Sequence, residues 1–224
     1  MNIRILVITA CLIAAMSSFR WLDRNAFDSF QVAGEPMEKY KEVRIGKQTW
    51  MNSNLTLTRF QNGDEILQVR TLQEWATANE NKKPAWCYYE DSKKNFGRYG
   101  ILYNGYAIQD QRGLAPKGWH IPTIEEWKEL ANFIDSNEGA ALKLMSKDGW
   151  KNRKGSDAHG FNAKPTGLRS DGGSFGEKGI SAYWWTSSRF AESNSYYYFS
   201  IESGYFDEGM HGRDYGFAIR CIKD

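Results

Sequence analysis

The sequence has few of the residues on which most metal and redox sites depend, with three histidines and three cysteines among 224 residues. His120, His159 and His211 are too far apart in the chain to form a known metal-ligand motif. A phosphate-binding glycine loop and a His-Glu-x-x-His helix are also missing. We find no catalytic constellation and predict that the protein is not an enzyme.

A strong excess of one charge is missing as well. Lysine and arginine total 29 against 27 acidic residues, which gives a net charge of +2. This balance gives no electrostatic basis for the capture of nucleic acid. The 41% hydrophobic and 15% aromatic content is that of a globular protein, which excludes a disordered or fibrous chain.

The amino terminus has the pattern of a secretory signal. Arg4 precedes the apolar run 5–16, which Ser17 and Ser18 follow. This run is shorter than the roughly 20 residues of a membrane-spanning helix, so we expect no membrane span in the mature chain. Cleavage before Cys11 would leave too short an apolar region, so we do not expect lipid anchoring there. The predicted organisation is a signal peptide over 1–18, a linker or arm over 19–41 and one domain over 42–224, in an extracytoplasmic protein that is secreted or held in the cell envelope.

Two cysteines remain after the leader, Cys87 and Cys221. In an oxidising compartment they could form a disulfide. They could equally be two buried free thiols, because both lie in apolar stretches. Neither has a histidine beside it in sequence, so nothing indicates a nucleophile.

Turn and cap residues predict the first elements. Gly46 and Lys47 join segments 43–45 and 48–51 in a hairpin with a type II′ turn. Asn62 and Gly63 indicate a second hairpin, with arms over 55–60 and 65–69. Capping boxes at 71–74 and 123–126 predict two helices. The first should bury Leu72, Trp75 and Ala76, and the second Ile124, Trp127, Leu130, Ala131 and Ile134.

Glycine becomes frequent in the second half of the chain. Segment 151–179 shows neither helical nor strand periodicity and is predicted to be a long loop. Short strands are predicted over 182–187, 196–201 and 217–222. In the last strand Phe217, Ile219 and Cys221 share one face, which indicates a central, core-facing strand.

Eight blocks of the sequence closely resemble, in order, the Fibrobacter succinogenes major paralogous domain. They are residues 43–55, 84–89, 99–104, 113–123, 126–127, 160–163, 184–188 and 216–224. The resemblance implies a bacterial, extracytoplasmic protein with an α+β, C-type-lectin-like fold: two helices, short antiparallel sheets and long glycine-rich loops. It also implies that the amino-terminal hairpin and the last strand lie close together. It implies no activity. Several family members have a cysteine where this chain has Ala115, so a bridge through that position is excluded.

Most of the tryptophans are predicted to be core residues, because each combines a large apolar area with one hydrogen-bond donor. The alternative for Trp119 and Trp185 is a sugar-stacking platform, which requires an exposed ring. His120, just before the second helix, is predicted to be a hydrogen-bonded structural residue. The set comprises Trp50, Trp75, Trp119, Trp127, Trp150, Trp184 and Trp185.

Calcium is the cofactor that the lectin-like fold would suggest. Four aspartates in glycine-rich loops could supply oxygen ligands: Asp157, Asp171, Asp207 and Asp214. Solvated turn aspartates are the interpretation that we favour, and we expect no cofactor.

The best candidate for a contact surface is the segment before the last strand, which is rich in tyrosine, serine and asparagine, as binding loops are. The alternative is that its tyrosines pack a strand. The predicted ligand-binding residues are Asn194, Tyr196, Tyr197, Tyr198, Tyr205, Asp207 and Asp214.

These observations favour a non-catalytic binding module that recognises an extracellular glycan or protein through its carboxy-terminal loops. One alternative is a relative of formylglycine-generating oxidases, which would need two reactive cysteines close together on a binding face. Another is a structural surface or assembly protein.

Overall fold

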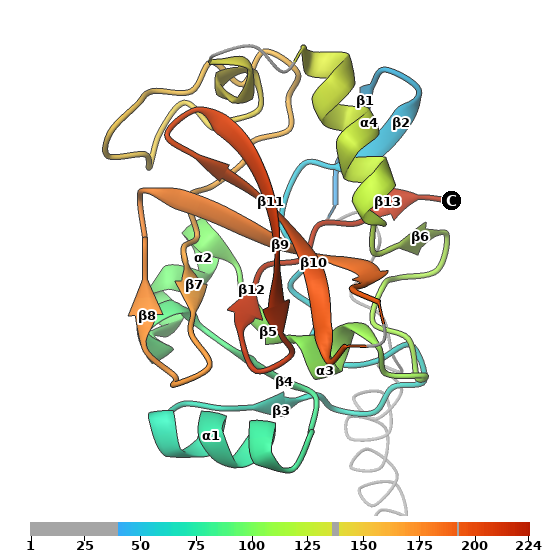
Figure 1. Ribbon diagram of the computed structural model, residues 1–224, viewed down its shortest axis with the longest axis vertical. Helices are drawn as coiled ribbons and strands as arrows, with labels where there is room; N and C mark the ends of the chain where they lie inside the picture. The colour runs from blue at the N-terminus through green and yellow to red at the C-terminus, as the bar shows by residue number, and fades with distance from the viewer. Residues whose placement is uncertain (1–39, 136–138, 192) are drawn as a thin grey trace, which may run out of the picture. The chain divides into compact units, whose positions relative to one another are not determined.

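The computed structural model describes residues 40–135, 139–191 and 193–224. All of them belong to the second of the two units into which the chain divides, residues 34–224. The predicted signal peptide, Cys11 and nearly all of the predicted arm lie outside the described residues. The described part has an α+β architecture with three sheets of four, three and six strands (Figure 1). No helix in it is long and apolar enough to cross a membrane.

The four-stranded sheet joins the two ends of the domain. Its order is β1 (Glu42–Ile45), β2 (Gln48–Met51), β13 (Ile222–Lys223) and β6 (Trp119–His120). Gly46 has a φ of 61°, as the predicted turn requires, and Ile222 pairs with Trp50. The first hairpin and its closeness to the last strand are therefore confirmed. Figure 1 shows both beside α4 (Ile124–Ile134).

Helix α4 matches its prediction residue by residue. Thr123 and Glu126 form a complete capping box. The buried residues are the five predicted ones, and the Trp127 ring stacks on Phe199 with centroids 4.8 Å apart. His120, which precedes the helix, is hydrogen-bonded to Glu126 at 2.9 Å and to Asp224 at 2.8 Å. The expected hydrogen bonding of His120 is thus confirmed.

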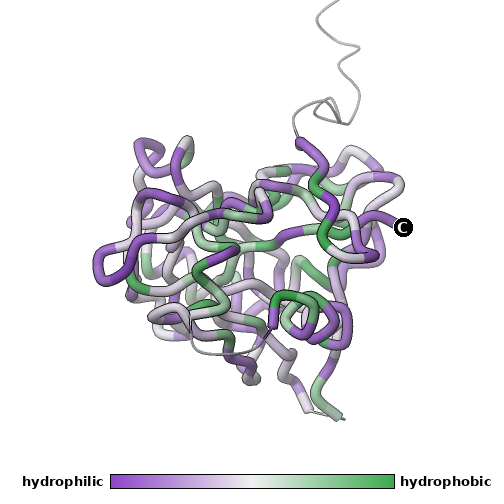
Figure 2. Tube along the Cα trace, turned by 90° about the horizontal axis from the view of Figure 1, so that it is seen from above, coloured by the Kyte–Doolittle hydropathy of each residue, from purple (hydrophilic) through white to green (hydrophobic). Residues whose placement is uncertain are grey.

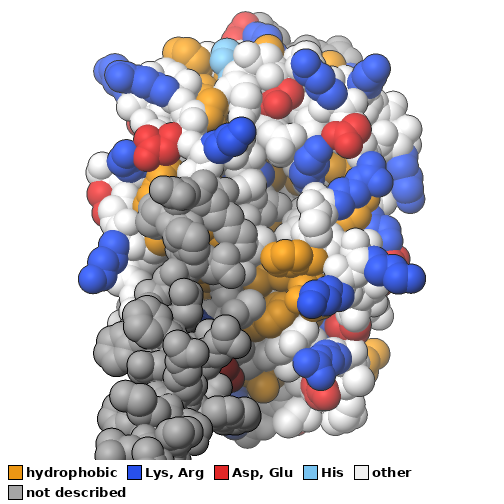
Figure 3. Space-filling view, turned by 180° about the vertical axis from the view of Figure 1, so that it is seen from behind, with side chains coloured by type: hydrophobic (Ala, Val, Ile, Leu, Met, Phe, Trp, Pro, Cys, Tyr) orange, Lys and Arg blue, Asp and Glu red, His pale blue; other side chains and the backbone are white. Residues whose placement is uncertain are grey.

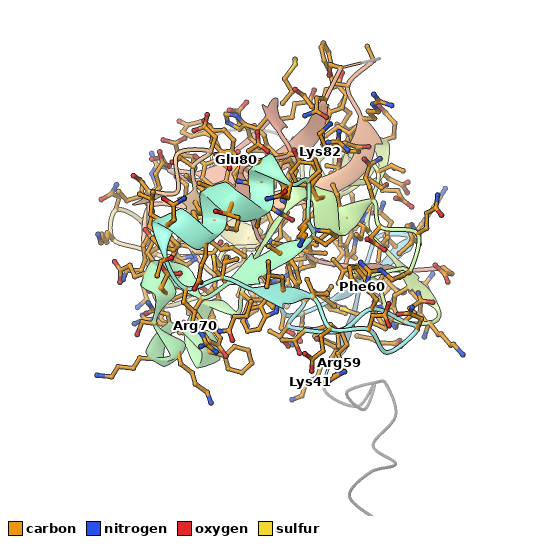
Figure 4. The ribbon with its side chains drawn as sticks, turned by 90° about the horizontal axis from the view of Figure 1, so that it is seen from below. Lys41, Arg59, Phe60, Arg70, Glu80 and Lys82 are labelled. Atoms are coloured by element: carbon orange, nitrogen blue, oxygen red, sulfur yellow. The ribbon has the colours of Figure 1, made fainter. Side chains whose placement is uncertain are left out.

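Helix α1 (Leu72–Glu80) follows its cap less closely. The Thr71 hydroxyl accepts a bond from the Glu74 backbone, but the Glu74 side chain accepts from the backbone of Arg70 instead of that of Thr71. The predicted burial of Leu72 is wrong. Its side chain is 55% exposed, because the helix turns Trp75, Ala78 and Asn79 inward. Glu80, the last residue of this helix, is labelled in Figure 4.

The six-stranded sheet is assembled from very short strands. Its order is β3 (Leu67–Gln68), β4 (Ala85–Cys87), β5 (Leu102–Asn104), β12 (Gly216–Phe217), β7 (Leu168–Arg169) and β8 (Phe175–Gly176). The predicted second hairpin is reduced to one bridge, between Arg59 and Glu65, because β3 pairs in parallel with β4 instead. Strands β7 and β8 also interrupt the long loop predicted over 151–179.

The three-stranded sheet runs between two hydrophobic cores. Its order is β11 (Tyr205–Gly212), β10 (Ser195–Glu202) and β9 (Ser181–Arg189). Trp184 and Phe199 enter the core beneath α4, and Trp185 and Tyr196 enter the other core. Strands β9 and β10 of this sheet are thus covered on both faces.

The predicted last strand is not continuous. Its first residues form β12 in the six-stranded sheet, and its last residues form β13 in the four-stranded sheet. All residues from 216 to 222, which include the strand β12 and the start of β13, are buried. Phe217, Ile219 and Cys221 belong to one core, as predicted. The segment bends because it is a central strand of two sheets in turn.

Two further helices were not foreseen, α2 (Phe96–Tyr99) and α3 (Gly105–Ile108), so the described residues form four α-helices instead of two. Single 3₁₀ turns occur at Tyr89–Asp91, Lys93–Asn95 and Ala140–Lys143. Helices of one turn have no apolar period that a sequence could reveal. Figure 2 shows hydrophilic loops at the periphery and hydrophobic segments further inside.

The tryptophan predictions hold, apart from Trp150, which is only half-buried. Trp119 and Trp185 are buried, so neither ring is available as a sugar-stacking platform. Four others of the predicted set have no exposed surface: Trp50, Trp75, Trp127 and Trp184. Trp86, which the prediction omitted, is also buried in the core.

Candidate functional site

The predicted contact segment forms the β10–β11 hairpin, and the structure buries one of its candidates. Tyr196 is 1% exposed, and its hydroxyl has no hydrogen-bond partner. It lies in the core shared with Trp185 and Phe217. Tyr196 therefore does not belong to a contact surface, because the face of β10 that was expected to be open carries a second core.

The next two tyrosines are half-buried and point to opposite faces of the sheet. Tyr197 packs on the core beneath α4 and meets Phe190 edge-to-face at 5.6 Å. Tyr198 packs on the other core and meets Phe217 at 5.4 Å. Each of these two tyrosines therefore packs on a core and keeps part of its surface exposed.

Tyr205 and Asp207 lie at the turn of the hairpin, away from the other candidates. Tyr205 is 45% exposed, with the Arg153 guanidinium 5.7 Å from its ring centre, and Asp207 is exposed. At about 3.3 Å per residue, Tyr205 and His211 are roughly 20 Å apart along β11. One small ligand would not contact both ends of the hairpin.

At the other end of the hairpin, Asn194 and Asp214 are brought together through Arg213 and Tyr106. Arg213 donates a hydrogen bond to Asn194, and its guanidinium lies 4.9 Å from the centre of the Tyr106 ring. The Tyr106 hydroxyl donates to Asp214 at 2.9 Å. These groups are engaged with one another, and they fasten the hairpin to α3.

Beside this cluster, three aromatic rings form a stack that we call the aromatic ladder: Tyr198, His211 and Tyr215. The His211 ring lies 3.8 Å from Tyr215 at 18° and 5.2 Å from Tyr198 at 15°. All three are half-buried, and the fully buried Phe217 ring lies 5.4–5.9 Å from each of them. The Tyr198 and Tyr215 hydroxyls make no hydrogen bond within the described chain, and neither is enclosed. The ladder therefore offers aromatic surface and two available hydroxyls on a fixed floor.

A glycine across the sheet makes room for the ladder. Gly209 pairs with Tyr198, and a Cβ at Gly209 would stand 2.6 Å from the Tyr198 hydroxyl oxygen. The Tyr198 side chain therefore lies against the Gly209 backbone. A larger residue at 209 would displace the ring from its position on His211.

The electrostatics of the ladder keep its histidine neutral. Burial lowers the pKa of His211, and Asp171 opposes this shift. Asp171 also acts on Tyr215, whose pKa burial raises. The exposed Asp171 carboxylate therefore acts electrostatically on both His211 and Tyr215.

The sequence analysis did not identify His211 and Tyr215 as ladder residues, although the hairpin turn gave a signal for His211. Ser203 and Gly204 form a two-residue turn with φ of 51° and 85°, as in a type I′ hairpin. That turn fixes the pairing of Tyr198 with Gly209. Diagonal neighbours follow from the pairing, and His211 is one of them.

The four aspartates considered for calcium do not converge. Asp157 accepts from the backbone of Asn162, and Asp171 and Asp207 each accept from the backbone of the following residue. Within the described ranges, no three side chains of histidine, cysteine, aspartate or glutamate come close enough to hold a metal ion. Nothing in these contacts indicates a calcium site.

Of the two alternatives for the cysteines, the structure has the buried free thiols. Cys87 and Cys221 are unpaired and fully buried, and they belong to different cores. Burial raises the pKa of the Cys87 thiol to about 12 and raises that of Cys221 as well. Neither is a reactive thiolate at neutral pH.

Ser174 lies in a sequence pattern that is typical of some serine hydrolases. Residues 172–176 spell Gly-x-Ser-x-Gly, the sequence of a nucleophile elbow. Ser174 lies between β7 and β8, two antiparallel strands, whereas an elbow joins a strand to a helix. Its side chain makes no hydrogen bond with a histidine among the described contacts. The pattern is a tight turn.

Charge is distributed without a dominant patch on the face seen in Figure 3. Lysine and arginine side chains are spread across it around exposed hydrophobic groups, with acidic side chains between them. This agrees with the small net charge. The visible part of this face therefore offers no single charge field as a candidate site.

Comparison with known proteins identifies the family. The model of the Fibrobacter succinogenes major domain matches residues 43–223, and the chain therefore belongs to this family. No curated protein and no solved structure matches the chain. The family has no established function from which an activity could be taken.

Proposed function

We propose that this family member is a secreted or envelope-associated, non-catalytic binding module that recognises an extracellular carbohydrate through the aromatic ladder. The observation that carries the proposal is the stack of Tyr198, His211 and Tyr215 at the surface. The stack is held by Phe217 beneath it. A site that is formed before binding loses little conformational entropy when the ligand arrives.

The polar groups around the ladder suit a sugar. The two tyrosine hydroxyls can donate or accept hydrogen bonds, and the Asp171 carboxylate can accept them. Sugar rings combine apolar C–H faces with hydroxyls at their edges, so they complement aromatic rings flanked by such groups. Because His211 is neutral at pH 7, the ladder adds no positive charge that would favour an anion.

The proposal includes the lectin-like fold and an extracytoplasmic location. The fold is supported by the pairing of β2 with β13 at the two ends of the domain and by the long loops. The location is supported by the signal pattern of residues 1–18. Binding of this kind needs no cofactor.

The buried cysteines favour a binding module over an oxidase. An oxidase of the formylglycine-generating type would need two reactive cysteines close together at a surface. Cys87 and Cys221 are both buried and lie in different cores. A structural surface protein would not need free hydroxyls on a half-buried aromatic stack, and the binding experiment separates this alternative from the binding module.

The test uses the full chain on a glycan array, followed by titration calorimetry with the best glycan. Tyr198→Phe and Tyr215→Phe each remove one hydroxyl and keep the ring. We expect each to weaken binding about fivefold, or roughly 1 kcal/mol. Because neither hydroxyl has a partner in the fold, the melting temperature should stay unchanged.

Tyr205→Phe is the matched control, since it removes a tyrosine hydroxyl at the other end of the hairpin. It should bind like the unmodified protein. Loss of binding in Tyr205→Phe alone would move the contact surface to the hairpin turn. Two results together would refute the proposal. The chain would bind no glycan, and a protein ligand would bind all three variants as tightly as the unmodified chain.

A further inference from the structure

A second concave site lies on other elements of the domain, between residues 53–56, helix α2 and residues 162–164. It is a pocket of about 290 Å³. Its walls combine aromatic rings, amides, hydroxyls and cations, and none of its lining residues is acidic. The polar and charged residues that the argument uses are Ser53, Asn54, Arg98, Asn162, Lys164 and Arg220.

Arg220, behind this pocket, is fully buried without a countercharge. Its Nε and Nη2 both donate to the Asn54 amide oxygen, at 3.1 and 2.7 Å, and its Nη1 donates to the Phe161 carbonyl. No carboxylate of the described residues forms an ion pair with it; Asp157 acts on it only through a longer-range charge interaction. Burial lowers the pKa of Arg220 to about 9, so it stays charged at neutral pH.

The other fully buried arginine shows what a structural arginine looks like in this protein. Arg169 is paired with the Asp91 carboxylate at 3.1 Å and donates to the carbonyls of Gly173 and Thr71. A buried charge is costly unless an opposite charge accompanies it. Arg220 therefore has an excess positive charge at the base of a pocket, and Arg169 does not.

The rim of the pocket adds two more cations. Lys164 is paired with Asp148 at 2.7 Å, and Asp148 also interacts with Arg98. Asp148 itself is largely exposed and is not a lining residue. Both rim cations thus line the pocket, and the exposed Asp148 carboxylate interacts with each of them.

Asn54 connects the buried charge to the pocket. Its oxygen accepts three hydrogen bonds, two from Arg220 and one from Trp184 Nε1 at 2.9 Å. Its Nδ2 makes no hydrogen bond with the described residues, although Asn54 lines the pocket. The amide is polarised toward Arg220, which strengthens Nδ2 as a donor to an anion.

We propose that this pocket binds an acidic sugar, with its carboxylate held by Asn54, Lys164 and Arg98 in the field of the buried Arg220. The aromatic residues Tyr99 and Phe96 line the same pocket and would contact the sugar ring. Charge-assisted hydrogen bonds from these donors are about twice as strong as neutral ones. The site is independent of the aromatic ladder.

The experiment titrates the full chain by calorimetry and by amide NMR with three probes: glucuronate, glucose and inorganic sulfate. Glucuronate should bind at least tenfold more tightly than glucose and should shift the resonances of residues 97–100. Sulfate that bound as tightly as glucuronate would support the anion site and would remove the sugar ring from it. Equal binding of glucuronate and glucose, or no binding of either anion, would overturn the proposal.

Four variants test the residues. Lys164→Gln and Arg98→Gln should each weaken glucuronate binding about fivefold, whereas Lys117→Gln, an exposed lysine away from the pocket, should leave it unchanged. Asp148→Asn removes the carboxylate between the rim cations and should strengthen binding two- to fivefold. An equal effect of Lys117→Gln, or weaker binding in Asp148→Asn, would show that the anion binds elsewhere.

Asn54→Asp separates the site from the fold. The aspartate keeps an acceptor for Arg220 and adds the missing countercharge, so the melting temperature should not fall. The same carboxylate would repel an anion, so glucuronate binding should be lost. Tyr198→Phe, in the ladder, should bind glucuronate normally, which distinguishes failure of this site from failure of the ladder.

Discussion

The strongest prediction about stability concerns the hydrogen bonds at Asn54. Replacement of Asn54 by leucine, a side chain of similar size, removes the oxygen that accepts from Arg220 Nε, Arg220 Nη2 and Trp184 Nε1. Three buried donors then have no acceptor, and two of them belong to a charged group. An unsatisfied buried donor costs about 1–3 kcal/mol, and more where the donor belongs to a charged group.

We therefore expect Asn54→Leu to lower the free energy of unfolding by about 4 kcal/mol. A domain of this size has about 5–15 kcal/mol in total, so the change is large. Urea unfolding followed by tryptophan fluorescence measures it, and an unchanged slope with urea would show that only stability has changed.

Two controls identify the cause. Asn52→Leu changes a nearby, half-buried asparagine whose side chain makes no hydrogen bond with the described residues, and it should stay within about 0.5 kcal/mol of the unmodified protein. Asn54→Asp restores the acceptor and should be at least as stable as asparagine. A cost below about 1 kcal/mol for Asn54→Leu would refute the argument that this oxygen holds the buried guanidinium.

Three further predictions follow from the contacts. Burial opposes protonation of His120, but hydrogen bonds with Asp224 and Glu126 outweigh it and raise its pKa. His120→Gln should therefore cost about 0.5–1 kcal/mol below pH 6.5 and progressively less as the pH rises. Burial lowers the pKa of His211, so the stability that this residue contributes is present above about pH 6.5 and is lost as the pH falls. The free energy of unfolding of His211→Gln, measured between pH 5 and 8, checks this trend, which is opposite to that of His120. Alkylation of Cys87 and Cys221 at pH 8 should need unfolding, and a reductant should not change the melting temperature; modification of either thiol in the folded protein would contradict their burial.

The elements that sequence predicted well are those that local residues determine. Helix α4 has its cap, its period and its burial within residues 123–134. The first hairpin has its turn at Gly46, where the positive φ is needed. The last predicted strand was only partly right, because its two ends pair with different sheets and nothing local indicates the break.

The candidate site was predictable only in outline. The tyrosine-rich segment carries two rungs of the ladder, Tyr198 and His211, but only Tyr198 was a predicted binding residue, and the predicted Tyr196 is buried. A period of two assigns alternate residues to two faces, and it does not say that both faces of β10 are covered. Tyr215 joins the stack from beyond the hairpin, so the ladder depends on tertiary packing that no single segment encodes.

Arg220 shows why the second site could not be predicted from its own segment. It stands between Ile219 and Cys221, where alternation would assign a charged residue to solvent. Instead it meets Asn54, which is 166 residues earlier in the chain. Exceptions of this kind, where a buried polar group contradicts the local pattern, are expected at sites kept for function. A polar cross-link alone would not need a charge, since an uncharged side chain could bond to Asn54 without the cost of burial. The Phe161 ring, 4.3 Å from the guanidinium, gives the charge a partial counterpart within the fold, and an anionic ligand in the pocket would supply a full countercharge.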